Sequence, residues 1–315
     1  MPIYSTVLIS PLYPFHRHED HICRILSLAL RVAAIPHVKR ADAIDDATVL
    51  NFALTLEHLE NAFYSGALEK FSELDFMMAG LPTFARGRFA QVAEHEAAHV
   101  AFLSAALGDK ATQPCNYSFP YIDPKSFAGL SQAIEGVGVS AYTGAVQYIT
   151  DKSYLSAAAS VLATEARHAS WVASAVNKYA GWSGALDIPL GLNQVYSIAA
   201  AFITDCPSTN PALPVKAFPT LTVKTTRYSP GKTIELDYTP ATPIADGTAL
   251  YVAFYTGLSA EYAKLEGGKV VIPDDLRGQV YAVVTTNNTA VDDGNIIAGP
   301  AILLLEFNSA GKLMI

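Results

Sequence analysis

Apolar residues recur at intervals of three and four positions from about residue 45 to residue 205, a pattern typical of helices that bury one face. The pattern divides into five segments: VLNFALTLEHLENAFYSGAL, FARGRFAQVAEHEAAHVAFLSAAL, FAGLSQAIEGVGVSAYTGAVQYI, YLSAAASVLATEARHASWVASAVNKYAG and GLNQVYSIAAAFI. The first four predict long helices and the fifth a shorter one. Pro82 and Gly108 are expected to bound the second helix, and Asp151 and Gly181 the fourth.

The connections between these segments differ in length. The third and fourth helices meet within a few residues around Thr150, whereas GDKATQPCNYSFPYIDP separates the second from the third. The longer connection can run back along the outside of a bundle. Together the segments predict a four-helix bundle with one long crossover, followed by a fifth helix.

After Cys206 the pattern changes to short runs rich in β-branched and aromatic residues, which predict a small antiparallel β-sandwich. The runs are TLTVKT, TIELDYT, ALYVAFYTG, KVVIP, QVYAVVTT and AILLLEF. The preceding PSTNPALPVKAFP is rich in proline and indicates a stiff linker that cannot pack. We therefore expect a multidomain chain, α then β, in which the sandwich serves packing or partner contact. The expected parts are a leader or pro-segment (1–40), a helical bundle (41–206), a linker (207–219) and a β-sandwich (220–315).

Composition narrows the classes of function. Charged residues make up only 16% of the 315-residue chain and apolar residues 51%, which indicates a globular protein with a weakly charged surface. The net charge of -8, without a run of Lys or Arg longer than two, argues against a nucleic-acid partner. The nearest approach to a membrane span, residues 195–203, is far too short to cross a bilayer.

The N-terminal region has features of a secretory leader. ILSLALRVAAIPHVKR combines a short apolar run and small residues with the dibasic pair Lys39-Arg40, the elements of a leader followed by a processing site. Arg24 and Arg31 interrupt the apolar stretch, which is unusual for a leader.

Two other features also favour an extracellular protein. Asn-x-Ser/Thr acceptor sites for glycosylation begin at Asn116 and Asn287, although such short matches also arise by chance. Removal of the leader would leave two cysteines, Cys115 and Cys206, and the sequence alone does not decide whether they pair.

Two Glu-x-x-His motifs lie in the predicted bundle, one in the second helix and one in the fourth. They are Glu96 with His99 and Glu165 with His168. A separation of three residues leaves about 60° between two side chains on a helix, so each pair can converge on one point.

The first and third helices each carry a glutamate followed seven residues later by a tyrosine. These pairs are Glu57 with Tyr64 and Glu135 with Tyr142. Seven residues return to within about 20° of the starting direction, so each pair shares a helix face.

Four carboxylates and two imidazoles from four helices form the ligand set of a dinuclear metal site in a bundle core. A single Glu-x-x-His is more often a surface pair, but two of them with two Glu/Tyr pairs favour a metal site. Four buried carboxylates would repel one another and lose hydration, and two divalent cations would cancel their charge. The oxygen and imidazole donors suit iron or manganese, and zinc would also fit. The expected ligands are Glu57, Glu96, His99, Glu135, Glu165 and His168.

Three further residues are candidates for the same site. Glu60 lies about 60° around the helix from Glu57 and is an alternative ligand, a base beside the ligands or simply a polar residue. Tyr64 and Tyr142 are either core tyrosines or partners of the site that hydrogen-bond a ligand carboxylate or donate an electron.

Other residues beside the motifs receive simpler interpretations. His58 and His95 lie about 100° from the neighbouring glutamates and are expected to point outward. Gly136 and Gly138 follow Glu135 directly and indicate either tight helix packing or room for a small oxidant beside the metals.

The segments LTLEHLENAFY, EHEAAH, AIEGVGVSAY and TEARH together resemble the ferritin-like superfamily. More narrowly, they resemble the ferritin-like domain of fungal stress-response and plant desiccation-related secreted proteins. The resemblance covers residues 45–205, about half of the chain. It implies metal ligation by the six residues above, with Glu165 in doubt because the matching glutamate of manganese catalases looks like a base beside the metals.

The resemblance is weak for activity, because the superfamily includes ferroxidases, rubrerythrin-type peroxidases, manganese catalases and oxygenases. The leading hypothesis is a dinuclear iron or manganese protein that reacts with peroxide or dioxygen in oxidative or desiccation stress and needs no organic cofactor. Glu96 and Glu135 are the expected bridging ligands, and His99 and His168 the terminal nitrogen ligands. The alternative is a non-catalytic metal-binding or stress-protective structural protein with an interaction sandwich. A homo-oligomer is compatible with either, and iron storage is a weaker third option.

Overall fold

The computed structural model describes residues 44–314 of the chain. These residues all fall within one compact unit. The segment interpreted as a leader, residues 1–40, lies outside the described residues, so that interpretation stays a prediction.

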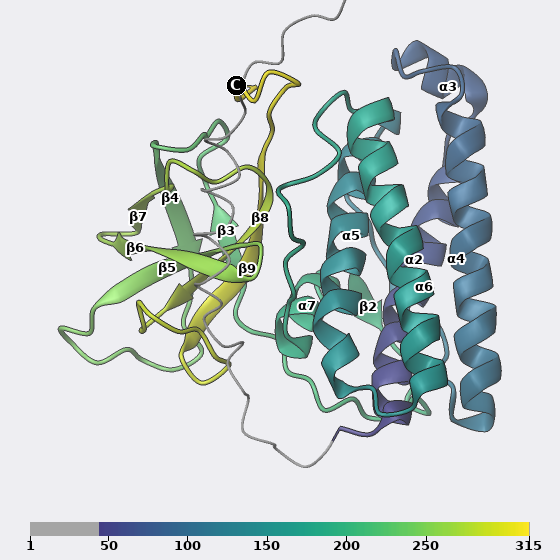
Figure 1. The fold of residues 1–315 in the computed structure, drawn as a ribbon, viewed down its shortest axis with the longest axis horizontal. Helices are drawn as coiled ribbons and strands as arrows, with labels where there is room; N and C mark the ends of the chain where they lie inside the picture. Colours follow the sequence, from purple (N-terminus) through teal and green to yellow (C-terminus); the bar gives the residue numbers. More distant parts are fainter. Residues whose placement is uncertain (1–43, 315) are drawn as a thin grey trace, which may run out of the picture. The chain divides into compact units, whose positions relative to one another are not determined.

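The first half of the described chain is helical, as expected, and antiparallel sheets follow it (Figure 1). The predicted fold class, a helical bundle followed by a small β domain, is therefore confirmed. The short helix α3 was not expected from the sequence. The helices are α2 (Asp46–Lys70), α3 (Glu73–Met78), α4 (Ala85–Leu107), α5 (Pro124–Ala145), α6 (Lys152–Trp171) and α7 (Leu192–Ala199).

The helix ends follow from local hydrogen bonding. The Asp151 side chain accepts hydrogen bonds from the amides of Ser153 and Tyr154 and so caps α6, as predicted. Gly108 ends α4 with a φ of 56°, a backbone conformation that L side chains rarely adopt. The expectation that α6 continues to Gly181 is wrong. It ends earlier, and a turn of π-helix follows it.

An aromatic cluster fills the bundle core near one end. Phe63, Phe89 and Phe127 come from α2, α4 and α5, and all three are fully buried. The rings of Phe63 and Phe127 have centroids 5.0 Å apart, and those of Phe89 and Phe127 are 4.8 Å apart. Since each buried Phe contributes roughly 1.5–3 kcal/mol, this cluster fixes the relative positions of the three helices.

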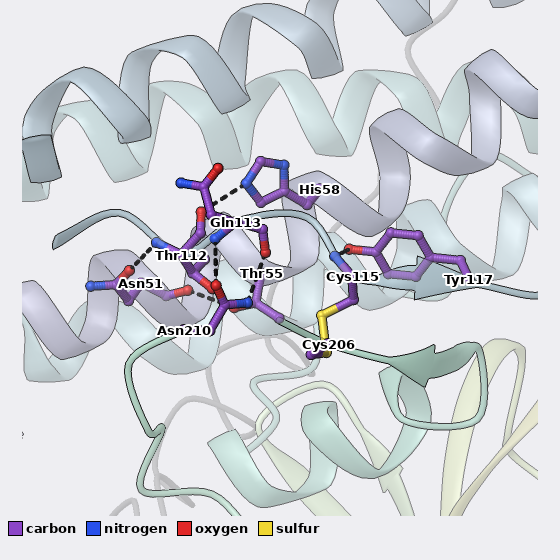
Figure 2. The surroundings of a disulfide bond; sticks show 9 residues. All are labelled: Asn51, Thr55, His58, Thr112, Gln113, Cys115, Tyr117, Cys206 and Asn210. Atoms are coloured by element: carbon purple, nitrogen blue, oxygen red, sulfur yellow. Dashed lines mark hydrogen bonds between the residues drawn. A yellow bond between two sulfur atoms is a disulfide. The ribbon is translucent and has the colours of Figure 1, made fainter. Parts of the chain in front are cut away.

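The crossover between α4 and α5 is attached to the end of the helical region. Strand β1 (Asn116–Tyr117) pairs antiparallel with β2 (Ile203–Asp205). Cys115 and Cys206 form a disulfide beside this pairing, with Cα atoms 4.2 Å apart (Figure 2). The sequence did not decide whether these two cysteines pair, and the structure shows that they do.

The β domain contains a three-stranded sheet in the order β3-β4-β7 and a four-stranded sheet in the order β6-β5-β8-β9. One apolar cluster includes Leu221 and Ile234 from the first sheet and Phe254 and Val280 from the second, so the sheets pack as a sandwich. Strand β6 was not predicted, because its sequence SAEYAKL lacks a regular apolar pattern. The strands are β3 (Leu221–Val223), β4 (Thr233–Tyr238), β5 (Leu250–Thr256), β6 (Ser259–Leu265), β7 (Lys269–Val271), β8 (Gly278–Thr285) and β9 (Ile296–Leu305).

Strand β8 packs directly on α5. The Tyr281 hydroxyl donates a hydrogen bond to the Gly136 carbonyl at 2.8 Å, and the Gln279 side chain donates one to the Ala133 carbonyl at 3.0 Å. Both carbonyls flank Glu135 in the sequence. The β domain therefore supports the segment of α5 that carries this glutamate.

The proline-rich stretch 207–219 also packs, contrary to expectation. Leu213 and Val215 lie against the hydrophobic core of the bundle, because apolar side chains alternate with the prolines. Asn210 exchanges hydrogen bonds of 2.8 Å with the backbone of Gln113 in the crossover. The predicted boundaries of the two domains remain predictions.

Candidate metal centre

The bundle interior brings together the six side chains predicted as metal ligands. They come from α2, α4, α5 and α6, one or two from each helix. All four carboxylate residues are fully buried, and the two histidines are mostly buried. The residues are Glu57, Glu96, His99, Glu135, Glu165 and His168.

These residues form two overlapping groups that could each hold a metal ion. In each group, one ligand atom per residue lies within 4.8 Å of all the others. Glu96 and Glu165 belong to both groups, whereas Glu57 and Glu135 belong to one each. The groups are Glu57, Glu96, His99 and Glu165, and Glu96, Glu135, Glu165 and His168.

The residues shared by the two groups differ from the expected bridging pair. Glu96 is shared as predicted, but its companion is Glu165 and not Glu135. Glu165 lies on α6, and its carboxylate reaches both groups, while Glu135 on α5 reaches only the group of His168. The grouping favours Glu165 over Glu135 as the second shared ligand, and the bridging role of Glu135 stays a prediction.

Each histidine directs Nδ1 toward the carboxylates. His99 Nδ1 lies 3.1 Å from Glu57 and 3.2 Å from both Glu96 and Glu165. His168 Nδ1 lies 3.1 Å from Glu96 and 3.3 Å from Glu135. Both imidazoles thus present one nitrogen to the space that the carboxylates surround.

Several of these atoms lie close to an opposite charge, yet among the described residues they are buried without a hydrogen bond of good geometry. They are Glu96 Oε1, Glu135 Oε2, both carboxylate oxygens of Glu165 and His168 Nδ1. A buried polar atom without a partner costs free energy, more so when it is charged, and a bound cation would satisfy all five atoms at once. The donor set of oxygens and imidazole nitrogens is suitable for iron, manganese or zinc. The residues therefore fit a pair of metal ions.

The buried carboxyl groups retain protons more strongly than exposed ones. Burial raises the pKa of Glu57 to about 8, although His99 acts to lower it. Burial also raises the pKa of Glu165 well above its ordinary value, and the charges of Glu96 and Glu135 act in the same direction. A metal ion that binds at neutral pH must displace such protons.

The pKa shifts of Glu96 and of the two histidines favour their charged forms. Burial acts to raise the pKa of Glu96, but His168 and His99 outweigh it and lower the pKa to about 2. Burial acts to lower the pKa of His99, but contacts with three carboxylates raise it to about 12. The pKa of His168 is raised to about 10 against the effect of burial, mainly by Glu135 and Glu96. Without metal, protonated histidines thus balance part of the carboxylate charge.

The two tyrosines form reciprocal hydrogen bonds across the bundle. The Tyr64 hydroxyl on α2 donates to Glu135 on α5, and the Tyr142 hydroxyl on α5 donates to Glu57 on α2. Each tyrosine therefore serves the glutamate of the other Glu/Tyr pair. The predicted hydrogen bonds to ligand carboxylates are present, but each runs between α2 and α5 and not between the two members of a Glu/Tyr pair on one helix.

Glu60 is a fifth buried carboxylate beside the six residues. Burial raises its pKa well above the ordinary value, and the charge of Glu165 contributes in the same direction. Gly138 lies next to both groups, because a Cβ atom at this position would be 3.0 Å from oxygens of Glu60 and Glu165. The absence of a side chain at Gly138 leaves space for these two carboxylates. Gly136 has a different role, since a Cβ atom there would lie 2.5 Å from the Gln279 amide, which indicates tight packing.

A further histidine, not predicted to take part, lies beside the site. His95 is exposed, as expected, but its Nδ1 lies 2.8 Å from His168 Nε2, and the two ring planes are nearly parallel. Its position one residue before Glu96 was the only available signal. His58, also expected to point outward, is instead buried, and Nε2 lies 3.1 Å from the Thr112 carbonyl (Figure 2).

Comparison with known proteins defines the class. Residues 45–178, which contain all six candidate ligands, match the family model of a ferritin-like domain. Residues 45–178 therefore form a ferritin-like domain.

A curated relative supports the same assignment. The chain is 25% identical over 174 residues to Protein rds1 of Schizosaccharomyces pombe, and the match covers 55% of this chain and 42% of that protein. The match thus spans less than half of the relative's length. Within residues 44–314, each helix is too short or too polar to serve as a membrane span.

Proposed function

We propose that this protein holds two iron or manganese ions in its helical bundle and reacts with peroxide or dioxygen as part of a stress response. The observation that carries the proposal is the pair of overlapping ligand groups with unpaired buried donor atoms. When bound, a redox-active metal pair would supply electron exchange with the oxidant. Peroxide disproportionation would need no other substrate, because one peroxide supplies the electrons that another accepts.

The residues have distinct roles in this proposal. Glu96 and Glu165 belong to both ligand groups, and each group also contains one further glutamate and one histidine, so these six residues would hold the ions. Tyr64 and Tyr142 orient Glu135 and Glu57 by hydrogen bonding and so keep the donor oxygens directed into the site. The apolar core around the site would allow only small molecules to reach it.

Metal analysis followed by a peroxide assay tests the proposal. Protein produced with both iron and manganese available should contain two ions per chain and release oxygen from peroxide, and chelation should abolish the reaction. His99→Ala should lose both one metal ion and the turnover. A protein that binds two ions but turns over neither peroxide nor dioxygen would favour a structural or protective role, and one that binds none would overturn the proposal.

Two conservative variants on α4 provide a matched comparison. Glu96→Gln removes a charge that both metal positions share, so both ions should bind more weakly. Glu94→Gln makes the same chemical change at an exposed position two residues away and should retain two ions. Equal metal content in the two variants would contradict the shared role of Glu96.

We also propose that the protein is secreted. The proposal is supported by the disulfide between Cys115 and Cys206, since disulfides persist mainly in oxidising compartments. Asn116, in the first glycosylation acceptor site, is exposed. Mass spectrometry of the protein from its natural source should detect the disulfide and a glycan at Asn116 or Asn287. A protein with free thiols and no glycan would contradict secretion.

A further inference from the structure

The two ends of the metal centre have similar ligands but different surroundings. Each end combines one histidine, one glutamate of its own and the two shared glutamates. The His168 ring is in contact with a second imidazole, His95, whose ring is nearly parallel to it at 13° with centroids 5.1 Å apart. Within residues 44–314, the hydrogen-bond contacts of the His99 ring all involve Nδ1, the nitrogen that faces the carboxylates.

The contact between the two imidazoles has a defined direction when a metal is bound. His168 Nδ1 faces Glu96 and Glu135, so it is the nitrogen available to an ion. Nε2 then carries the ring proton and donates it to Nδ1 of His95 at 2.8 Å. Such an outer hydrogen bond fixes the orientation of a ligating histidine and increases its basicity.

The helix geometry explains why His95 reaches this position. His95 and Glu96 are consecutive on α4, so their side chains differ in direction by about 100°. Glu96 therefore points into the bundle while His95 points along its surface toward His168 on α6. His95 remains exposed and makes no contact with the carboxylates that would make it a ligand itself.

The two histidines also differ in solvent exposure. The side chain of His99 is 13% exposed, whereas that of His168 is 6% exposed. The His99 end of the site is therefore more exposed to solvent than the His168 end. Both differences favour slower release of an ion from the His168 end.

We propose that His95 is a positioning residue that makes the two metal positions unequal, so that the His168 end binds its ion more tightly than the His99 end. This inference rests on the proposed function only in so far as the protein binds two ions. It concerns affinity and does not depend on which oxidant reacts.

Titration of the full, metal-depleted chain with Mn²⁺ tests the inference. Calorimetry should resolve two binding steps in the unmodified protein. His95→Phe keeps an aromatic ring but removes the acceptor, and it should weaken the tighter step by roughly 10- to 100-fold, the usual effect of losing an outer partner of a metal ligand. His95→Asn places an amide oxygen near the position of Nδ1 and should restore most of the affinity.

A spectroscopic readout separates positioning from a general loss of stability. In protein loaded with Co²⁺, the ring N–H protons of the two ligating histidines should give shifted NMR signals that exchange with water. The signal of His168 should exchange more slowly than that of His99, and this protection should disappear in His95→Phe. Gln91→Phe places the same ring on the exposed face of α4 one turn earlier and should leave both signals and both affinities unchanged.

The outcomes distinguish this inference from the proposed function. Failure of the unmodified protein to bind Mn²⁺ or Co²⁺ would overturn the metal centre itself. Binding of two ions with equal affinity, or an unchanged tight step in His95→Phe, would overturn the role of His95 and leave the metal centre intact.

Discussion

Gly138→Ala is the substitution that tests the geometry of the centre most directly. Gly138 lies in the middle of α5, where alanine is intrinsically more favourable than glycine by about 1 kcal/mol. The added Cβ atom would lie 3.0 Å from oxygens of Glu60 and Glu165, closer than nearly all such contacts in proteins. The two carboxylates would have to move by a few tenths of an ångström.

The two effects act on different properties. The gain in helix propensity acts on the free energy of unfolding, and it offsets part of the cost of the tight contact. The displacement acts on Glu165, which both metal positions share, and ligand groups must be held to within about 0.5 Å for full affinity. We therefore expect a melting temperature within about 2–4 °C of the unmodified protein in the presence of chelator. We expect Mn²⁺ affinity to fall by about 10-fold or more, the size of effect seen when support of a metal ligand is lost.

Other glycines of the same helix supply the controls. A Cβ atom added at Gly129 would have no heavy atom within 4 Å, so Gly129→Ala should raise the melting temperature and leave metal binding unchanged. Gly144 is the opposite case, because a Cβ atom there would lie 1.9 Å from the backbone oxygen of Leu190, and Gly144→Ala should destabilise the protein by about 1–3 kcal/mol or more. Thermal unfolding with chelator and Mn²⁺ titration measure the two properties separately. Unchanged metal affinity in Gly138→Ala would refute the placement of Glu60 and Glu165 beside this glycine.

The remaining predictions concern four other features. Removal of the disulfide by Cys115→Ser with Cys206→Ser, which opens a loop of 91 residues, should lower the free energy of unfolding by about 2–5 kcal/mol in denaturant titrations. Because the pKa of Glu57 is raised to about 8, metal binding releases protons, and Mn²⁺ affinity measured between pH 6 and 8 should rise about 10-fold per pH unit for each proton released. By the same shift, thermal unfolding of the metal-free protein should show stability falling as the pH rises from about 4.5 to about 8, since the folded state holds a proton that the unfolded state has already lost. Tyr142→Phe should weaken Mn²⁺ binding by about 10-fold without changing the number of ions, because a hydrogen bond to a charged group contributes about 1.5–3 kcal/mol. Tyr281→Phe should lower the free energy of unfolding by about 1 kcal/mol through loss of the contact between β8 and α5, and an unchanged melting curve would contradict that support.

Helical spacing was sufficient to predict which side chains enter the site. The three-residue separation of Glu96 and His99 depends only on the pitch of one helix, and the structure places both beside the other candidate ligands. Which carboxylates are shared depends instead on how α5 and α6 are rotated about their axes relative to α4. That rotation is set by tertiary packing, so the sequence pattern could not show that Glu165, and not Glu135, belongs to both ligand groups.

Features that depend on contacts between distant segments were not accessible from the pattern. The pairing of Cys115 with Cys206 joins residues far apart in the chain and could only be considered, not assigned. The contact of His95 with His168 crosses from α4 to α6 and has no periodic signal. Strand β6 was missed because its stability comes from pairing with β5 and not from its own composition.

The reciprocal tyrosine bonds have a consequence for fragments of the chain. Helix α2 packs on α4 and α5 packs on α6, so cleavage in the crossover before Cys115 would produce two fragments, each with one helical hairpin and half of the ligands. Glu57 in the first hairpin accepts its hydrogen bond from Tyr142 in the second. Glu135 in the second hairpin accepts its hydrogen bond from Tyr64 in the first, so each separated hairpin lacks the hydroxyl that orients its glutamate. Separated hairpins should therefore bind metal poorly, and mixing them should restore the centre only on reassembly.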